Sequence, residues 1–311
     1  MKIEPIDEII PLTIGNVHIE NNLNLFSLLI EDVKNFGSII IGKIFNDDKR
    51  INEYVRSVVS CLLRQLIEYM DAIAILIKKS SSDPCILILR GLFENHIYLK
   101  FVLREKSEER AKAYYVSHLL TKKRNAEEHD FSTNLGRELK NKIEKDDISK
   151  YLSLTTQNCQ SEVDKIDKIL QKPKYQYIKN EFDKRKMERK KTHWYSLFNG
   201  PTNLELLSNS VGCLGRYNIL YRYFSKYAHS ENQLDNIDPQ GAGMAGLVQI
   251  RNPEQAQQIT QLTLTYGLDS FRIAIETLFP SLLNYYKQFY KENIEHLSSE
   301  MRNKNLIQVI R

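Results

Sequence analysis

The chain reads SDPCILILRGLFENHIYLKFVLR from Ser82 to Arg104, and this stretch decides the fold class. Asp83 is a residue type that caps the N-termini of helices, and Pro84 suits the first helical position. A helix is therefore predicted from Pro84 to about Arg104. It is apolar on almost every side, which is typical of a central element in a helical core. The stretch predicts a helical bundle packed around it.

Helical patterns continue on both sides of this segment. Apolar residues recur with a period near 3.6 over Asn21–Ile41 and Arg50–Lys79, and Pro253 and Pro280 begin further helices. We find no convincing run of alternating apolar and polar residues, so we predict an all-α protein built on a helical bundle. The expected divisions are an N-terminal helical segment over 1–45, a single bundle domain over 46–295 and a C-terminal tail over 296–311.

Charge is concentrated in one part of the chain. The net charge is +5, and residues 121–200 carry 19 Lys and Arg against 13 Asp and Glu, a surplus of six. Apolar residues are sparse over 121–191, so we expect a charged helical arm or insertion on the bundle. Its most basic run is either a solvated helix face or an RNA-binding surface, because clustered cations attract phosphates. The candidate RNA-binding residues are Lys184, Arg185, Lys186, Arg189, Lys190 and Lys191.

A second helix carries the residues that suggest chemistry. The sequence reads YRYFSKYAH from Tyr221 to His229, inside a helix predicted from about residue 212 to 230. Arg222, Ser225 and His229 follow each other at intervals of three and four residues, which places them on one helical face. A permanently charged guanidinium and an imidazole that titrates near neutral pH suit metal-independent chemistry on a phosphate.

Two charged residues stand out on the apolar helix. Arg90 and Glu94 are four residues apart and can form a pair on one face. Charges in a core helix are costly unless they are hydrogen-bonded or functional. If the two helices pack together, this pair faces Arg222, Ser225 or His229 in one polar cluster.

Of the neighbouring polar side chains, we include two tyrosines in the predicted cluster and leave one histidine out. Tyr217 and Tyr221 precede Ser225 by about two turns and one turn, and their hydroxyls can join the cluster. His96 follows Glu94 by two residues and lies on a different face, so we leave it outside the predicted site.

Both segments carry a resemblance to known proteins. Arg90–Glu94, with its R-x-L-x-E pattern, and Tyr221–His229, with its Y-R-x-x-S-x-x-x-H pattern, resemble a bacterial all-helical family of uncharacterised function over roughly residues 50–275. The second segment also resembles the R-x(4–6)-H motif of the HEPN superfamily of helical ribonucleases and toxins, which commonly dimerise to form a shared cleft. The resemblance implies a homodimeric, metal-independent ribonuclease acting on RNA, as a toxin or a phage-defence effector. It implies that the catalytic site contains Arg222, His229, Ser225, Glu94 and Arg90.

Two other interpretations of the same cluster remain open. The residues can form a ligand or nucleotide pocket without catalysis, or a buried network that fixes the register of the helices. In both cases the protein is a non-enzymatic helical module, and the charged arm is a protein-interaction surface.

Cofactors and membranes are not expected. Cys61, Cys85, Cys159 and Cys213 have no metal-site spacing, and the histidines have no zinc-protease spacing. The apolar runs are far shorter than the roughly 20 residues of a membrane span. The N-terminus lacks the shape of a signal peptide. We therefore expect a cytoplasmic protein without a metal or a cofactor.

Overall fold

The computed structural model describes residues 16–46, 51–146, 155–188, 190, 192–228, 233–238 and 246–307. Over these residues the protein is all-α, as predicted, apart from a two-residue pairing of β1 (Ile237–Asp238) with β2 (Gly246–Leu247). The chain forms two compact units, of which the first joins Met1–Glu105 to Ser208–Arg311 and the second is Lys106–Leu207.

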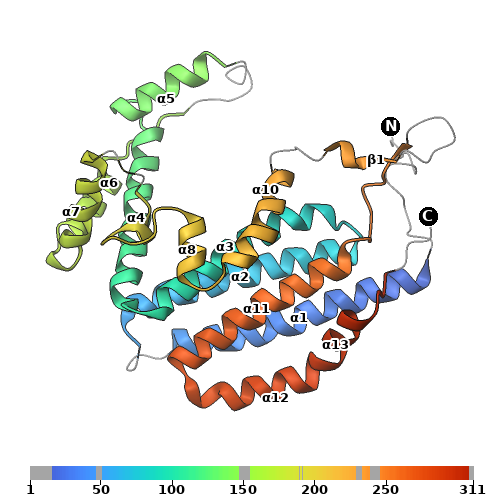
Figure 1. The fold of residues 1–311 in the computed structure, drawn as a ribbon. Helices are drawn as coiled ribbons and strands as arrows, with labels where there is room; N and C mark the ends of the chain where they lie inside the picture. The colour runs from blue at the N-terminus through green and yellow to red at the C-terminus, as the bar shows by residue number, and fades with distance from the viewer. Residues whose placement is uncertain are drawn as a thin grey trace. The chain divides into compact units, whose positions relative to one another are not determined.

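Four long helices form the bundle of the first unit. α1 contacts α2 and α11, and α3 contacts the same two helices (Figure 1). Their apolar side chains fill the interior, among them the fully buried Phe26, Leu63 and Phe93. Removing this apolar surface from water stabilises the bundle by roughly 25 cal/mol per Å². The four helices are α1 (Val17–Phe45), α2 (Glu53–Lys78), α3 (Asp83–Arg104) and α11 (Ala256–Leu278).

One glycine allows α1 and α11 to approach closely. A Cβ atom at Gly37 would lie less than 3.0 Å from three atoms of the Phe271 ring. Phe271 is fully buried and also meets the edge of Phe36, with ring centroids 6.4 Å apart. The Phe271 ring therefore occupies the space that a side chain at position 37 would fill.

The start of α3 differs from the prediction by one residue. Asp83 is the first helical residue, and Ser82 holds the N-cap position without a side-chain cap. Pro84 lies in the first turn, where its missing N–H costs nothing. The predicted N-cap role of Asp83 is thus wrong, although its carboxylate still faces the positive end of the helix dipole.

The helix predicted over residues 212–230 is interrupted. It consists of α9 (Leu214–Arg216), the π-helical turn η3 (Tyr217–Tyr221) and α10 (Arg222–Ala228). The Arg222 N–H bonds to the Tyr217 carbonyl, the wider spacing that defines such a turn. The prediction of one uninterrupted helix is therefore wrong. α10 packs against α3, the pairing on which the predicted polar cluster depends.

The C-terminal part of the first unit continues from α11 through short helices. Gln257 of α11 donates to the Met301 and Lys304 carbonyls at 2.7 and 2.8 Å, which ties residues 301–304 to the bundle. The remaining elements of this unit are η4 (Gln233–Asn236), η5 (Pro280–Leu282), α12 (Leu283–Asn293) and α13 (Glu295–Asn303).

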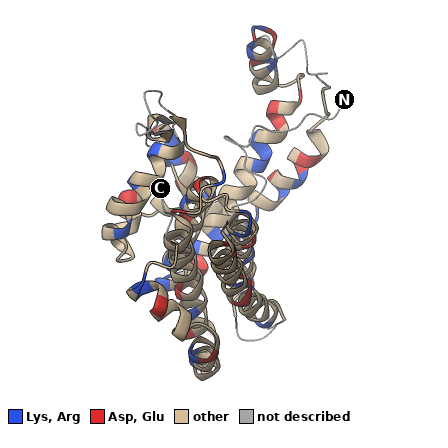
Figure 2. Ribbon diagram, turned by 90° about the vertical axis from the view of Figure 1, so that its right-hand side faces the viewer, with Lys and Arg blue, Asp and Glu red and all other residues tan. Residues whose placement is uncertain are grey.

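The second unit contains the charged segment predicted over 121–191 and extends beyond it at both ends. The 1–45 segment, expected to stand apart, contributes α1 to the first unit's bundle. Positive and negative residues are interspersed along the helices (Figure 2). The second unit holds α4 (Ser107–His129), α5 (Asn134–Glu144), α6 (Gln160–Leu170), α7 (Pro173–Met187) and η2 (Trp194–Ser196), and α8 (Leu204–Ser210) spans the boundary.

Among the helices that the structure describes, none combines the length and the apolar character that crossing a bilayer requires.

Candidate functional site

A hydrogen-bonded triad links α3 to the π turn. Tyr221 Oη donates to Glu94 Oε1 at 2.8 Å and accepts from Arg90 Nη2 at 2.8 Å. Arg90 Nε lies 3.4 Å from the same Glu94 oxygen, and both charged side chains are 29% exposed. Burial, and then the hydrogen bond to Glu94, raise the pKa of Tyr221 to about 12, so the phenol remains a donor at neutral pH.

Guanidinium groups and aromatic rings continue from this triad into α10. Arg90 Cζ lies 4.8 Å from the centroid of the Tyr221 ring, which stacks on the Tyr217 ring at 5.0 Å. Arg222 Cζ lies 6.0 Å from the centroid of Tyr217. These four side chains form an arginine–tyrosine ladder with a cation at each end. Each cation–π contact contributes about 0.5–1 kcal/mol where it is exposed.

The predicted catalytic residues divide into three groups in the structure. Arg90 and Glu94 come together, and the side chain that joins them is Tyr221. Arg222 is exposed and Ser225 is half-buried on α10, beside α3. His229 lies outside the described residues, so its place beside Arg222 stays a prediction.

A second polar cluster lies between α3 and α11 in the interior of the bundle. His96 Nδ1 is 2.8 Å from Ser270 Oγ, and His96 Nε2 is 3.4 Å from Asp269 Oδ2. The His96 side chain is completely buried, and this burial lowers its pKa well below the usual 6.5. His96 is therefore neutral at physiological pH.

Ser270, His96 and Asp269 are the three residue types of a hydrolytic triad, yet their surroundings oppose that role. A triad serine must reach a substrate carbonyl. Ser270 and His96 are both fully buried, so the serine hydroxyl is closed to a substrate. The cluster instead joins α3 to α11.

Three cationic side chains lie around the carboxylate of Asp269. Arg272 Nη2 bonds to Asp269 Oδ1 at 2.5 Å. The other carboxylate oxygen, Oδ2, has Arg216 Nη1 at 3.6 Å and Lys100 Nζ at 4.0 Å. The hydrogen bond from Arg272 and the nearby cations hold the pKa of Asp269 below its usual value against the opposing effect of burial.

The chain matches a family of unknown function, DUF5677, over residues 56–240, which is more than half of its length. The protein belongs to this family. The matched range contains the whole arginine–tyrosine ladder, whereas Asp269 lies beyond it. No curated protein and no solved structure matches the chain. The prediction of an uncharacterised family is confirmed, and the HEPN-like motif stays a prediction.

Sequence reasoning missed the polar cluster of this DUF5677 protein at His96 and Asp269. Each residue is a titratable side chain with large apolar residues close by in the sequence, which was the available signal: Asp269, for instance, follows Leu268 and precedes the buried Phe271 by two residues. The missing information was that α3 packs against α11, a contact between segments far apart in the sequence.

The predicted RNA-binding run lies in the second unit, at the end of α7. Lys184, Lys186 and Lys190 are exposed. Arg185 is only 7% exposed, so little of its side chain reaches solvent, and its part in an RNA-binding surface stays a prediction. The two remaining members, Arg189 and Lys191, lie outside the described residues.

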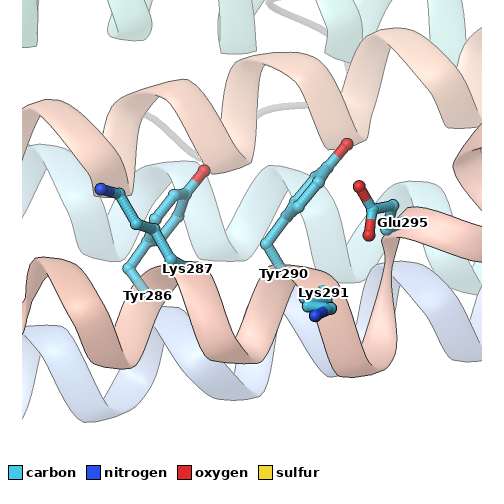
Figure 3. Close-up of a pocket in the computed structure, with 5 residues that line it drawn as sticks. All are labelled: Tyr286, Lys287, Tyr290, Lys291 and Glu295. Atoms are coloured by element: carbon cyan, nitrogen blue, oxygen red, sulfur yellow. The ribbon is translucent and has the colours of Figure 1, made fainter.

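A surface cavity of about 390 Å³ lies on α12 and the start of α13. Two tyrosine rings project from α12 on the same side, one turn apart, and the exposed Lys287 and Lys291 lie beside them (Figure 3). Its lining combines these two lysines with one carboxylate, that of Glu295. The residues that line it are Tyr286, Lys287, Tyr290, Lys291 and Glu295.

Proposed function

We propose that this protein is a HEPN-like, metal-independent ribonuclease of bacterial origin. The observation that carries the proposal is the exposed Arg222, which follows a π turn fixed to α3 through Tyr221. Turns of this kind are frequent at functional sites. The π turn that precedes Arg222 is fixed to α3 by hydrogen bonds, so the guanidinium starts from a defined position at the surface. Such a group suits the binding of a phosphate, because arginine binds two phosphate oxygens at once.

The proposed reaction uses the 2′-hydroxyl of RNA as the nucleophile. His229 takes the 2′-hydroxyl proton, the 2′-oxygen attacks phosphorus, and the bond to the 5′-oxygen breaks. Arg222 stabilises the charge on the pentacoordinate phosphate. In a homodimer, the protonated His229 of the second copy donates a proton to the departing 5′-oxygen. The products are a 2′,3′-cyclic phosphate and a 5′-hydroxyl.

The arginine–tyrosine ladder indicates which residues would support Arg222 in the proposed reaction. Glu94 and Tyr221 fix Arg90 at one end, and the stacked rings lead to Arg222 at the other. Ser225, one turn beyond Arg222, is available to hydrogen-bond the phosphate or His229. We place such an enzyme in the cytoplasm of a bacterium, as a toxin or a phage-defence effector.

The test is RNA degradation by the purified protein in EDTA. Wild type should cleave, and His229→Ala and Arg222→Gln should each lose at least a hundredfold in rate, because each removes a group that acts in the transition state. Arg302→Gln is the matched control, since Arg302 is an exposed arginine of the same unit. Equal cleavage by all four proteins, or cleavage that requires a divalent cation, contradicts the proposal.

A second candidate is a non-enzymatic module in which the polar cluster only sets helix packing. The observation that favours it is the mutual pairing of Arg90, Glu94 and Tyr221, which uses their polar atoms within the fold. A structural His229 would be buried, and His229→Ala would then lower stability by about 1–3 kcal/mol. A large fall in melting temperature for that variant, with inactive wild type, would select this candidate. A small fall with lost cleavage selects the ribonuclease.

A further inference from the structure

We infer that Arg216 and Lys100 form a phosphate-binding site that Asp269 holds in place. The inference goes beyond the proposed cleavage and does not require it. Its ligand is the phosphate group of a nucleotide, either free or within an RNA strand. The site is defined by the distances, the exposure and the charges around Asp269.

The donors of Arg216 and Lys100 are not used up by Asp269. N–H···O hydrogen bonds in proteins span about 2.7–3.2 Å. Arg216 Nη1 at 3.6 Å and Lys100 Nζ at 4.0 Å from Asp269 Oδ2 exceed that range. The carboxylate therefore attracts both cations and sets their positions, while their N–H groups remain available to an anion.

Solvent reaches the cations more readily than the carboxylate. The Arg216 side chain is 42% exposed and that of Lys100 is 22% exposed, whereas Asp269 is 16% exposed. An anion that approaches this surface meets ammonium and guanidinium groups above a partly covered carboxylate. Repulsion by Asp269 is reduced further because Arg272 binds its other oxygen.

The local balance of charge favours an anion. Three cations, Lys100, Arg216 and Arg272, surround Asp269, and Arg272 is shared with Glu276 at 2.8 Å. The neighbouring His96 is buried and neutral, so it adds nothing to either side. One positive charge remains without a counterion within this group.

Aromatic neighbours help to fix the position of Arg216. Arg216 Cζ lies 6.0 Å from the centroid of the buried Tyr266 ring, and this cation–π contact helps to hold the guanidinium in place. The next residue, Tyr217, is half-buried and belongs to the arginine–tyrosine ladder. Tyr217 already contacts Tyr221 and Arg222 within the ladder, so these rings position the arginines, and the phosphate is the group that the site recognises.

Arg216 also lies within reach of the proposed catalytic arginine. Arg216 and Arg222 flank the five residues of the π turn, and six steps at the α-helical rise would span about 9 Å along the axis. One RNA strand can therefore contact both guanidinium groups through different phosphates.

The experiment measures binding of a fluorescein-labelled single-stranded RNA by anisotropy, in EDTA, to full-length protein that carries His229→Ala. Arg216→Gln in this background should weaken binding roughly fivefold to twentyfold. It should also reduce the slope of log K against log salt by roughly 0.7 to 1, because one phosphate contact is lost. Lys100→Gln should act in the same direction, and Arg216→Lys should keep the charge and part of the affinity. The double variant Lys78→Gln/Lys79→Gln, which removes two exposed lysines of α2 and its C-cap, is the control.

Competition separates the sources of the phosphate. A nucleoside monophosphate that displaces the RNA from wild type, but not from Arg216→Gln, supports a nucleotide site. If inorganic phosphate displaces the RNA from wild type as well as the nucleoside monophosphate does at the same concentration, the site binds the phosphate group and the nucleobase does not contribute. RNA that neither competitor displaces, yet that Arg216→Gln releases, supports a site for the strand.

Three results overturn the inference. One is unchanged affinity in Arg216→Gln and Lys100→Gln, with melting temperatures that show both are folded. Another is loss of binding in Lys287→Gln/Lys291→Gln alone, which would place the phosphate at the α12 cavity. If Arg216→Gln fails to fold, full affinity in the folded Lys100→Gln overturns it as well. A protein that binds through Arg216 but never cleaves RNA supports this site and contradicts the ribonuclease proposal, so the two failures are distinguishable.

Discussion

A single hydroxyl group joins α3 to the π turn. Tyr221→Phe keeps the stacked ring but removes the donor to Glu94 and the acceptor for Arg90. We expect a loss of about 1.5–3 kcal/mol in the free energy of unfolding, because a hydrogen bond to a charged group contributes about that much. Urea denaturation measures it. Tyr217→Phe is the matched control, since the Tyr217 hydroxyl makes no hydrogen bond with the residues that the structure describes, and an equal loss in both variants would contradict the role of the Tyr221 hydroxyl.

The buried imidazole of His96 makes stability depend on pH. Burial lowers its pKa, so below about pH 6.5 the unfolded chain binds a proton that the folded protein excludes. Stability is therefore fully present above pH 6.5 and falls as the pH decreases, by up to about 1.4 kcal/mol per pH unit for one group. The groups that face His96 in the fold are Ser270, Asp269, Lys100, Arg216 and Arg272.

The measurement is urea denaturation at pH 7 and pH 5. Wild type should lose stability between the two, and His96→Gln, which cannot titrate, should show a much smaller difference. His296→Gln removes an exposed histidine of the same unit and should behave as wild type does. A His96→Gln variant with the full wild-type dependence would assign the effect to other groups.

At the scale of the helices, side-chain size limits how closely α1 and α11 can pack. Gly37→Ala puts a methyl group where the Phe271 ring lies, so α1 and α11 must separate or the ring must move. We expect a loss of roughly 1–3 kcal/mol from this overpacking. Gly42 lies on the same helix, and a Cβ atom there would meet nothing within 4 Å, so Gly42→Ala should be neutral or stabilising by up to about 1 kcal/mol. Thermal melts of the two variants compare them, and equal melting temperatures would refute the packing argument.

Local sequence patterns predicted most elements of the fold. The apolar stretch at residues 84–104 and the prolines at 253 and 280 lie in or near observed helices, because periodicity and proline positions act within a few residues. The π turn at Tyr217–Tyr221 was not predicted, since its wider spacing depends on how α10 meets α3.

The candidate site was predicted only in part for a related reason. Arg90 and Glu94 were identified as charges on an apolar helix, and their pairing follows from a spacing of four residues. The contact of His96 with Asp269 spans more than 170 residues of sequence. A pairing of that kind is fixed by the packing of α3 on α11, which no local pattern encodes.

At the scale of the whole molecule, both units present cations to solvent. The basic run of the second unit, at the end of α7 and just beyond it, presents Lys184, Lys186 and Lys190 to solvent, and Lys190 is paired with Glu188 at 2.7 Å. The first unit carries the ladder and the proposed phosphate site. If the protein binds RNA with both units, the two surfaces add phosphate contacts, and the affinity depends on salt through both of them.

Charge reversal tests the contribution of the second unit. The triple variant Lys184→Glu/Lys186→Glu/Lys190→Glu should weaken RNA binding at least tenfold at low salt and reduce the slope of log K against log salt by up to about two, because each lost phosphate contact removes about 0.7 for a single strand. The control reverses three other exposed lysines of the same unit, Lys165, Lys168 and Lys172, and so makes the same change in net charge. Equal weakening in the two variants would mean that only overall charge matters. Unchanged affinity in the α7 variant, with the Arg216→Gln effect intact, would leave the basic run as a solvated helix face and assign RNA binding to the first unit.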